Sequence, residues 1–78
     1  MEMEEKIRQL LGNVNEEIND VLADENLLTK GLIDSFDIVA LVVELEETFS
    51  IQLEADEIIE ENFSSIQNIQ ALIERKIS

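Results

Sequence analysis

Ser35 is the residue of this 78-residue chain whose position most suggests a chemical role. It stands at the start of the stretch LIDSFDIVALVVEL, Leu32 to Leu45, directly after Asp34. A serine hydroxyl at the amino terminus of a helix can act as a nucleophile, cap the helix, or accept a group that another enzyme attaches. Each role requires different partners from the rest of the sequence.

For Ser35 to act as a catalytic nucleophile, another side chain would have to serve as its general base, and the sequence offers no good candidate. The chain contains no histidine and no cysteine, so the usual general base and any reactive thiolate are both missing. Lys30 is the one nearby lysine, and it falls in a segment that we expect to be an open loop. The composition therefore disfavours serine hydrolysis, and we expect no catalytic residue.

A metal site has little support from the sequence. Residues 24–35 would have to serve as a calcium loop, but the sixth position is Thr29, where such a loop needs glycine. No glutamate closes the loop, because its last residue is Ser35. We therefore expect no metal ligands in this chain.

Two roles stay open for Ser35. It could cap the helix, which is a common structural use of serine. It could also be the acceptor of an attached group, because the exposed N–H groups and the dipole of a helix amino terminus stabilise an anionic phosphate. Composition by itself does not choose between cap and acceptor.

Hydrophobic spacing predicts an all-α chain that forms one domain, residues 1–78. The absence of proline and the abundance of Leu, Ile, Glu and Gln agree with this interpretation. Residues 13–33 are predicted to be a long connection held to the core by apolar anchors, with Gly31 offering a turn. A second helix is expected from Asp34 or Ser35 to about Thr48. The first helix carries a stripe made of Met3, Ile7, Leu10, Leu11 and Val14.

The remainder of the chain is predicted to add a short helix and a final long one. Residues 49–53 are expected to be extended, and residues 55–62 to form the short helix with Ile58 and Ile59 facing inward. A capping box is expected where Ser64-Ser65-Ile66-Gln67 opens the last helix. The fold class is thus a small four-helix bundle of three main helices and one short helix. The stripe of the last helix is Ile66, Ile69, Leu72, Ile73 and Ile77.

The second helix has more apolar residues than one buried face requires. At roughly 100° per residue, its apolar side chains separate into two groups that lie roughly 150° apart. An outer helix of a small bundle buries only one face, so the second should be at least partly exposed, although a fully enclosed helix is the alternative. One group is Ile38, Leu41, Val42, Leu45 and Phe49, and the other is Phe36, Val39, Ala40 and Val43.

The charge balance is strongly acidic, with 19 acids against 5 bases and a net charge of −14. Nucleic acid phosphates would repel such a chain, so we expect no nucleic acid partner. Basic surfaces of partner proteins would attract it, although the acids could simply keep a small domain in solution. With neither a signal-peptide pattern nor a membrane span in the sequence, we expect a cytoplasmic monomer.

The residues around Ser35 resemble the signature of the acyl carrier protein family. The run GLIDSF at residues 31–36 matches it, and so does the acidic LEETF that ends at Phe49. The resemblance covers nearly the whole chain, from the amphipathic first helix and the long loop to the opening of the last helix. Further matching positions are Asp37, Val39, Leu41, Leu45 and Glu46.

The resemblance implies that Ser35 carries 4′-phosphopantetheine through a phosphodiester, and that Asp34 helps to present the serine to a phosphopantetheinyl transferase. The thiol of the arm would then hold an acyl or aminoacyl group as a thioester, and client enzymes would do the chemistry. The implied partners are this transferase and acyl- or aminoacyl-loading and acyl-transferring enzymes with basic docking surfaces. The implied partner-binding residues are Phe36, Val39, Ala40, Val43, Glu46 and Glu47.

Two positions depart from carriers of fatty-acid synthesis. Phe36 follows the serine where those carriers usually have leucine, and Ala40 stands where they usually have glutamate. The GLIDSF start is similar to D-alanyl carrier proteins and to stand-alone carriers of specialised pathways. An acyl carrier is the leading hypothesis, and an aminoacyl or D-alanyl carrier is its alternative. A second alternative is a different class of protein, an acidic helical adaptor without a prosthetic group, in which Ser35 only caps the helix.

Overall fold

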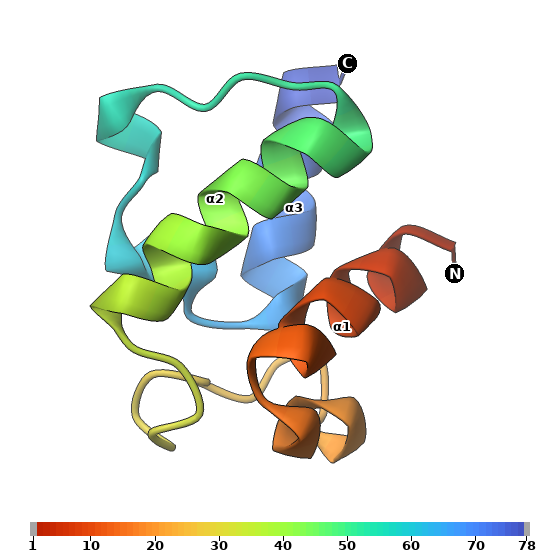
Figure 1. Cartoon of the computed structure of the whole chain (residues 1–78), viewed down its shortest axis with the longest axis vertical. Coiled ribbons are helices and arrows are strands. Elements are labelled where there is room, and N and C mark those ends of the chain that lie inside the picture. The colour runs from red at the N-terminus through yellow and green to blue at the C-terminus, as the bar shows by residue number, and fades with distance from the viewer. Residues whose placement is uncertain (1, 78) are drawn as a thin grey trace.

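The computed structural model describes residues 2–77, which form three α-helices and three short 3-10 helices. The α-helices are α1 (Glu2–Val14), α2 (Ser35–Phe49) and α3 (Ile66–Ile77). The 3-10 helices are η1 (Glu16–Asp20), η2 (Ala55–Glu57) and η3 (Glu60–Phe63), and no strand occurs within residues 2–77. The predicted all-α class is confirmed, as are its three main helices (Figure 1).

α1 supplies one wall of the core. Its first turn carries Glu2, Glu4 and Glu5, whose charges suit the positive end of the helix dipole. Ile7 and Leu11 are fully buried, and α1 packs against both α2 and α3. The other members of the predicted stripe are partly buried against the same core, which confirms it: Met3, Leu10 and Val14.

The long connection between α1 and α2 is held at several points, as predicted. The guanidinium of Arg8 in α1 donates to the carbonyl oxygen of Val21 at 2.6 Å. Farther along, the Leu27 N–H donates to Ser64 O at 2.6 Å, and the Gln67 N–H donates to Ala23 O at 2.9 Å. Leu27 and Ile33 are buried in the core as apolar anchors. The connection is therefore fixed to both α1 and the beginning of α3.

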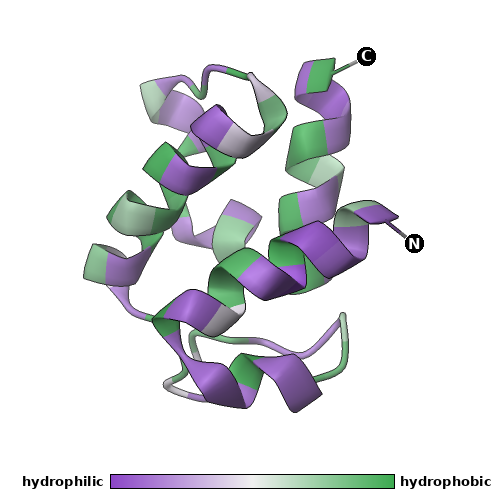
Figure 2. Ribbon diagram, turned by 45° about the vertical axis from the view of Figure 1, so that its right-hand side comes forward, coloured by the Kyte–Doolittle hydropathy of each residue, from purple (hydrophilic) through white to green (hydrophobic). Residues whose placement is uncertain are grey.

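α2 buries one of its two apolar faces. Ile38, Leu41, Val42 and Leu45 enter the core, and Phe49 is partly buried against it. In Figure 2 hydrophobic and hydrophilic residues alternate around each helix, and α2 carries hydrophobic residues along much of its length. The predicted inner face of α2 is thereby confirmed.

The short helix predicted for residues 55–62 is wrong as a continuous helix. The segment instead forms η2 and η3, separated at Ile58, whose φ of −89° and ψ of 69° are not helical. Carboxylates four residues apart would repel one another along an α-helix, as Asp56 would repel Glu60. Ile58 is partly buried as expected, whereas Ile59 is 45% exposed, so its predicted inward orientation is wrong.

α3 begins one residue later than its predicted capping box implies. The Ser65 hydroxyl, rather than that of Ser64, accepts a hydrogen bond from the Asn68 N–H at 3.1 Å. Four members of the predicted stripe are buried, but Ile77 is 54% exposed because the helix end extends beyond the core. The buried members are Ile66, Ile69, Leu72 and Ile73.

Together the three helices enclose one hydrophobic core, in which Phe63 is the largest fully buried side chain. None of the helices described for residues 2–77 has the length and apolar character that crossing a membrane requires.

Candidate functional site

Two aspartates define the start of α2. The Asp34 Oδ1 atom accepts a hydrogen bond from the Asp37 N–H at 3.0 Å, and the Asp37 Oδ2 atom accepts one from the Asp34 N–H at 3.0 Å. This reciprocal pair is a capping box with Asp34 as the N-cap residue. Both carboxylates also lie at the positive end of the helix dipole, which stabilises them.

Ser35 is thus the first residue inside α2 and does not cap it. Its side chain is exposed, and the hydroxyl makes no hydrogen bond to any other atom of residues 2–77. Because Asp34 already performs the capping, the Ser35 hydroxyl stays free for another use. The structure therefore removes the cap interpretation that the sequence had left open.

The surroundings of Ser35 fit an attached phosphate. The N–H groups of Ser35 and Phe36 belong to the first turn of α2, where a helix provides no carbonyl partner. The capping box occupies the N–H groups of Asp34 and Asp37 and leaves those two directed toward the start of the helix. Exposed N–H groups and the helix dipole both favour an anion at this point.

The chain that leads into α2 is held residue by residue. The Leu32 N–H donates to Leu27 O at 2.9 Å, and the Leu32 carbonyl accepts a hydrogen bond from Asn15 Nδ2 at 3.1 Å. Ile33 follows and is buried, only 3% exposed. Gly31 turns the chain just before this point with a φ of +72°, a value that glycine adopts without strain. An exposed hydroxyl thus stands on a well-anchored stretch of backbone.

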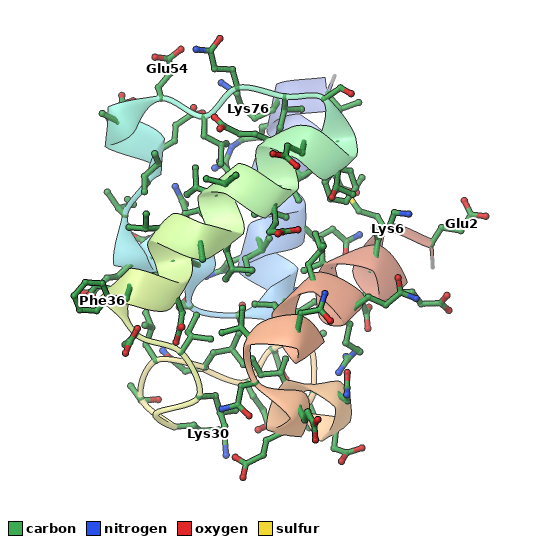
Figure 3. The ribbon with its side chains drawn as sticks, in the orientation of Figure 1. Glu2, Lys6, Lys30, Phe36, Glu54 and Lys76 are labelled. Carbon is green, nitrogen blue, oxygen red and sulfur yellow. The ribbon has the colours of Figure 1, made fainter. Side chains whose placement is uncertain are left out.

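The second apolar face of α2 is exposed, and the alternative of a fully enclosed helix is wrong. Phe36 is 85% exposed and projects outward from the start of α2 in Figure 3, while Val39 and Val43 are more than half exposed. Ala40, between them on the same face, is exposed as well. We call the face made by Phe36, Val39, Ala40 and Val43 the outer stripe of α2.

Carboxylates border the outer stripe, but they do not all play the same part. Glu47 is exposed, as expected of a residue that faces a partner. Glu46 is half-buried, and its Oε2 atom accepts a hydrogen bond from the Leu53 N–H at 2.9 Å. Its carboxylate thus holds the chain after α2 in place. This role of Glu46 is not predictable from the sequence, because nothing in the spacing of residues 46 and 53 indicates it.

The charged residues near the outer stripe are mostly negative. No lysine or arginine occurs between Lys30 and Arg75, whereas this part of the chain contains many acids. Lys30 is paired with Glu25 at 3.2 Å, and Lys76 with Glu57 at 2.9 Å. The surface near α2 therefore presents negative charge with little local compensation, which favours a basic partner.

Two glutamates away from α2 have perturbed acidities. The pKa of Glu57 is lowered, first by a hydrogen bond from the Glu54 N–H and then by its bond to Lys76. The pKa of Glu25 is lowered in the same way, first by the Leu22 N–H and then by Lys30. Both carboxylates therefore accept hydrogen bonds that hold neighbouring segments of the fold.

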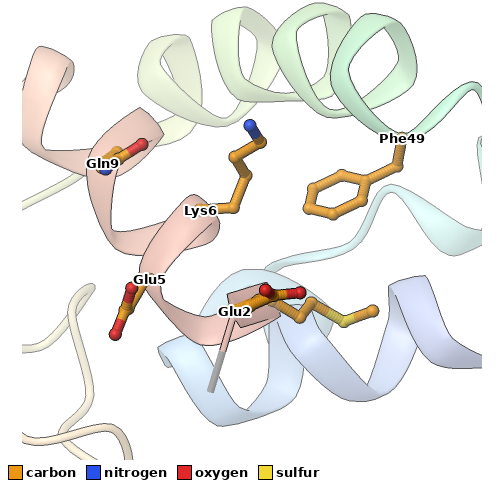
Figure 4. A pocket seen from close by; sticks show the side chains of 6 residues that line it. Glu2, Glu5, Lys6, Gln9 and Phe49 are labelled. Carbon is orange, nitrogen blue, oxygen red and sulfur yellow. The ribbon is translucent and has the colours of Figure 1, made fainter.

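A hollow elsewhere on the surface is not part of this site. It lies between the first turns of α1 and the last turn of α2, the end farthest from Ser35, and Lys6 and Phe49 help to line it (Figure 4). Within residues 2–77, no group of three potential metal-ligating side chains comes together. The start of α2 and its outer stripe bring together the residues that the sequence indicated as functional.

Comparison with known proteins identifies the class. The family described as "Phosphopantetheine attachment site" matches residues 4–74. The chain is 33% identical over 76 residues to the acyl carrier protein of Buchnera aphidicola subsp. Baizongia pistaciae (strain Bp), a match that covers 96% of this chain and 95% of that one. It is 32% identical over 69 residues to the D-alanyl carrier proteins of Streptococcus pyogenes serotypes M5 (strain Manfredo) and M1, with 88% of this chain and 87% of theirs covered.

The chain therefore belongs to the phosphopantetheine-binding carrier family, and the resemblance noted from its sequence is confirmed. Its members carry 4′-phosphopantetheine covalently on a serine, are modified by phosphopantetheinyl transferases and interact with loading enzymes. The protein is thus a carrier and not an enzyme.

Proposed function

We propose that this protein is a carrier whose phosphopantetheine arm is attached to the Oγ atom of Ser35. The observation that supports the proposal most is the division of work at the start of α2. Asp34 caps the helix, so the exposed Ser35 hydroxyl has no structural task within the described chain. Attachment at Ser35 would therefore leave every hydrogen bond of the capping box in place.

Transfer of the arm from coenzyme A forms the bond between Ser35 Oγ and phosphorus. The same step breaks the bond between that phosphorus and the adenosine bisphosphate portion, which leaves, and it releases the hydroxyl proton. Once attached, the arm supplies the thiol that this chain lacks, and the thiol carries the load as a thioester. The N–H groups of Ser35 and Phe36 would face the phosphodiester, and the capping box would keep this first turn formed.

The outer stripe of α2 would be the surface that partner enzymes recognise. Its exposed apolar side chains lie within a field of carboxylates, and Glu47 is the exposed acid at its far end. A partner with an apolar contact patch framed by lysines or arginines complements both properties. The transferase and the loading enzymes would share this surface, because each must reach Ser35.

The load is proposed to be an acyl group, and an aminoacyl or D-alanyl load is the second candidate. Two observations support the second candidate. Phe36 and Ala40 differ from the residues usual at these positions in carriers of fatty-acid synthesis, and the chain is similar to D-alanyl carrier proteins. A role in fatty-acid synthesis, a cytoplasmic location and a monomeric state stay predictions. An adaptor function without the prosthetic group has no support from the family.

The attachment test is a measurement of intact mass. The apo-protein is incubated with coenzyme A and a broad-specificity phosphopantetheinyl transferase, and one phosphopantetheine should be added. Ser35→Ala should add none, while Ser50→Gly, which changes an exposed serine at the other end of α2, should be modified as the wild type is. Modification that persists in Ser35→Ala, or its absence in the wild type, would remove Ser35 as the site.

The load test starts from the modified protein. Adenylating enzymes are offered fatty, hydroxy and amino acids, and the thioester that forms is identified by mass. A fatty acyl thioester supports the leading candidate. Thioester formation with amino acids alone would replace it with the aminoacyl carrier.

A further inference from the structure

Asn15 connects three parts of the chain through one side chain. It follows α1 directly, and its Oδ1 atom accepts a hydrogen bond from the Glu17 N–H at 3.0 Å, which caps η1. Its Nδ2 atom donates to the carbonyl oxygen of Leu32 at 3.1 Å. The two residues are 17 positions apart in the sequence, and the bond is partly buried. Asn15 therefore links the end of α1 to the backbone just before α2.

The bond at Leu32 completes a series of restraints on the approach to Ser35. The Leu32 N–H is already bonded to Leu27 O at 2.9 Å, so Asn15 holds the one backbone group of this residue that the loop itself leaves free. The next residue, Ile33, is anchored in the core, and Asp34 begins the capping box. Without Asn15, the Leu32 carbonyl would lose its partner and the turn at Gly31 would have more freedom.

We propose that Asn15 is a positioning residue for the modification of the protein: by holding the Leu32 carbonyl it fixes the path of the chain into α2 and so the place of the Ser35 hydroxyl. The inference depends on Ser35 being the attachment site. Displacement at phosphorus requires the attacking oxygen in line with the bond that breaks, and small losses of orientation reduce the rate of such a step. Asn15 acts through its hydrogen bond to the Leu32 carbonyl, and no hydrogen bond joins its side chain to Ser35 within residues 2–77.

The test uses a substitution that separates the two hydrogen bonds of Asn15. In Asn15→Ser the hydroxyl can still cap η1, since serine is as good an N-cap residue as asparagine, but it is too short to keep the bond to Leu32. The matched control is Asn62→Ser, which also removes a bond from an asparagine Nδ2 to a backbone carbonyl. Asn62 donates to Glu57 O at 2.8 Å, in a segment that does not lead to Ser35.

The full-length apo-variants are assayed with coenzyme A and the transferase at a temperature where all are folded. For Asn15→Ser we expect kcat to fall roughly two- to tenfold, the range that corresponds to loss of one ordinary hydrogen bond. KM should stay close to the wild-type value because the outer stripe of α2 is unchanged. Hydrogen exchange at the Leu32 amide should also become faster. Asn62→Ser should change neither kcat nor this exchange rate.

Other results would overturn the proposal in distinguishable ways. An unchanged kcat and unchanged Leu32 exchange in Asn15→Ser would reject the positioning role while leaving Ser35 as the site. An equal fall of kcat in Asn62→Ser would reject it too, because a general loosening of the fold would then explain the loss. A wild-type protein that gains no mass at Ser35 would reject the attachment site and the positioning role together.

Discussion

Asp34 and Asp37 exchange hydrogen bonds at 3.0 Å each across the first turn of α2, and Ser35 lies between them in the chain with a hydroxyl that makes no hydrogen bond within residues 2–77. A serine at the start of a helix could both cap the helix and accept an attached group, and here these two roles belong to different residues. The aspartates form the helix terminus, which leaves the serine available for modification.

The capping box should be worth measurable stability. Asp34→Ala removes the acceptor for the Asp37 N–H, and we expect the free energy of unfolding to fall by about 0.5–2 kcal/mol. Asp34→Asn keeps an oxygen acceptor and should lose much less. Urea unfolding of the three proteins measures the difference. A stability of Asp34→Ala equal to that of the wild type would show that the box does not hold the start of α2.

Substitution of Glu47 should affect partner binding, whereas substitution of Glu46 should affect the stability of the fold. Glu47→Lys is expected to slow association with the transferase about three- to tenfold at low salt, because it reverses an exposed charge next to the outer stripe. Its stability should hardly change. Glu16→Lys, the same charge reversal on η1, is the control and should slow association less. Equal slowing by both substitutions would point to net charge rather than to the α2 surface.

Glu46→Lys should act on the fold instead. It removes the acceptor of the Leu53 N–H, and the expected loss is about 1 kcal/mol in the free energy of unfolding. Glu46→Gln retains an oxygen that can accept this bond, so it should stay near the wild type. Thermal unfolding of both variants is the measurement. If Glu46→Gln were as unstable as Glu46→Lys, the charge and not the hydrogen bond would be responsible.

Ser50 ends α2 in a strained backbone conformation that can be relieved. Its φ of 55° and ψ of 47° are left-handed, a region in which glycine is favoured at helix ends. Ser50→Gly should therefore raise the free energy of unfolding by up to about 1 kcal/mol. A less stable Ser50→Gly would contradict this account.

The bond between Glu57 and Lys76 should make stability depend on acid pH. The folded state lowers the pKa of Glu57 below its usual 4.5, so the stabilisation is present above that value and is lost as the pH falls through the folded-state pKa. Denaturant unfolding of Glu57→Gln and the wild type should thus differ at neutral pH and converge in acid. Glu61→Gln, which changes an exposed acid of η3, should not show this convergence. A constant difference between Glu57→Gln and the wild type at all pH values would exclude the ionised carboxylate as the cause.

Much of the molecule could be predicted from local patterns. The three long helices, the buried stripe of each and the exposed outer stripe of α2 follow from hydrophobic spacing, because a small bundle buries one face of each helix. The Asp-Ser start of α2 could be located in the same way. The choice of N-cap could not, since Asp34 and Ser35 are both good caps and only the backbone geometry shows which one performs the task.

The sequence by itself determined the all-α class, the acidic surface and the serine at a helix start, because these depend on composition and on spacing within single segments. The division of residues 55–63 into η2 and η3 has a local cause, repulsion between carboxylates four residues apart, which hydrophobic spacing does not register. Tertiary structure decided the exposure of Ile59 and the hydrogen bonds of Glu46 and Asn15, because these depend on how separate segments of the chain pack together. Local periodicity contains no information about such contacts, whereas a folded backbone brings Asn15 and Leu32 within hydrogen-bonding distance.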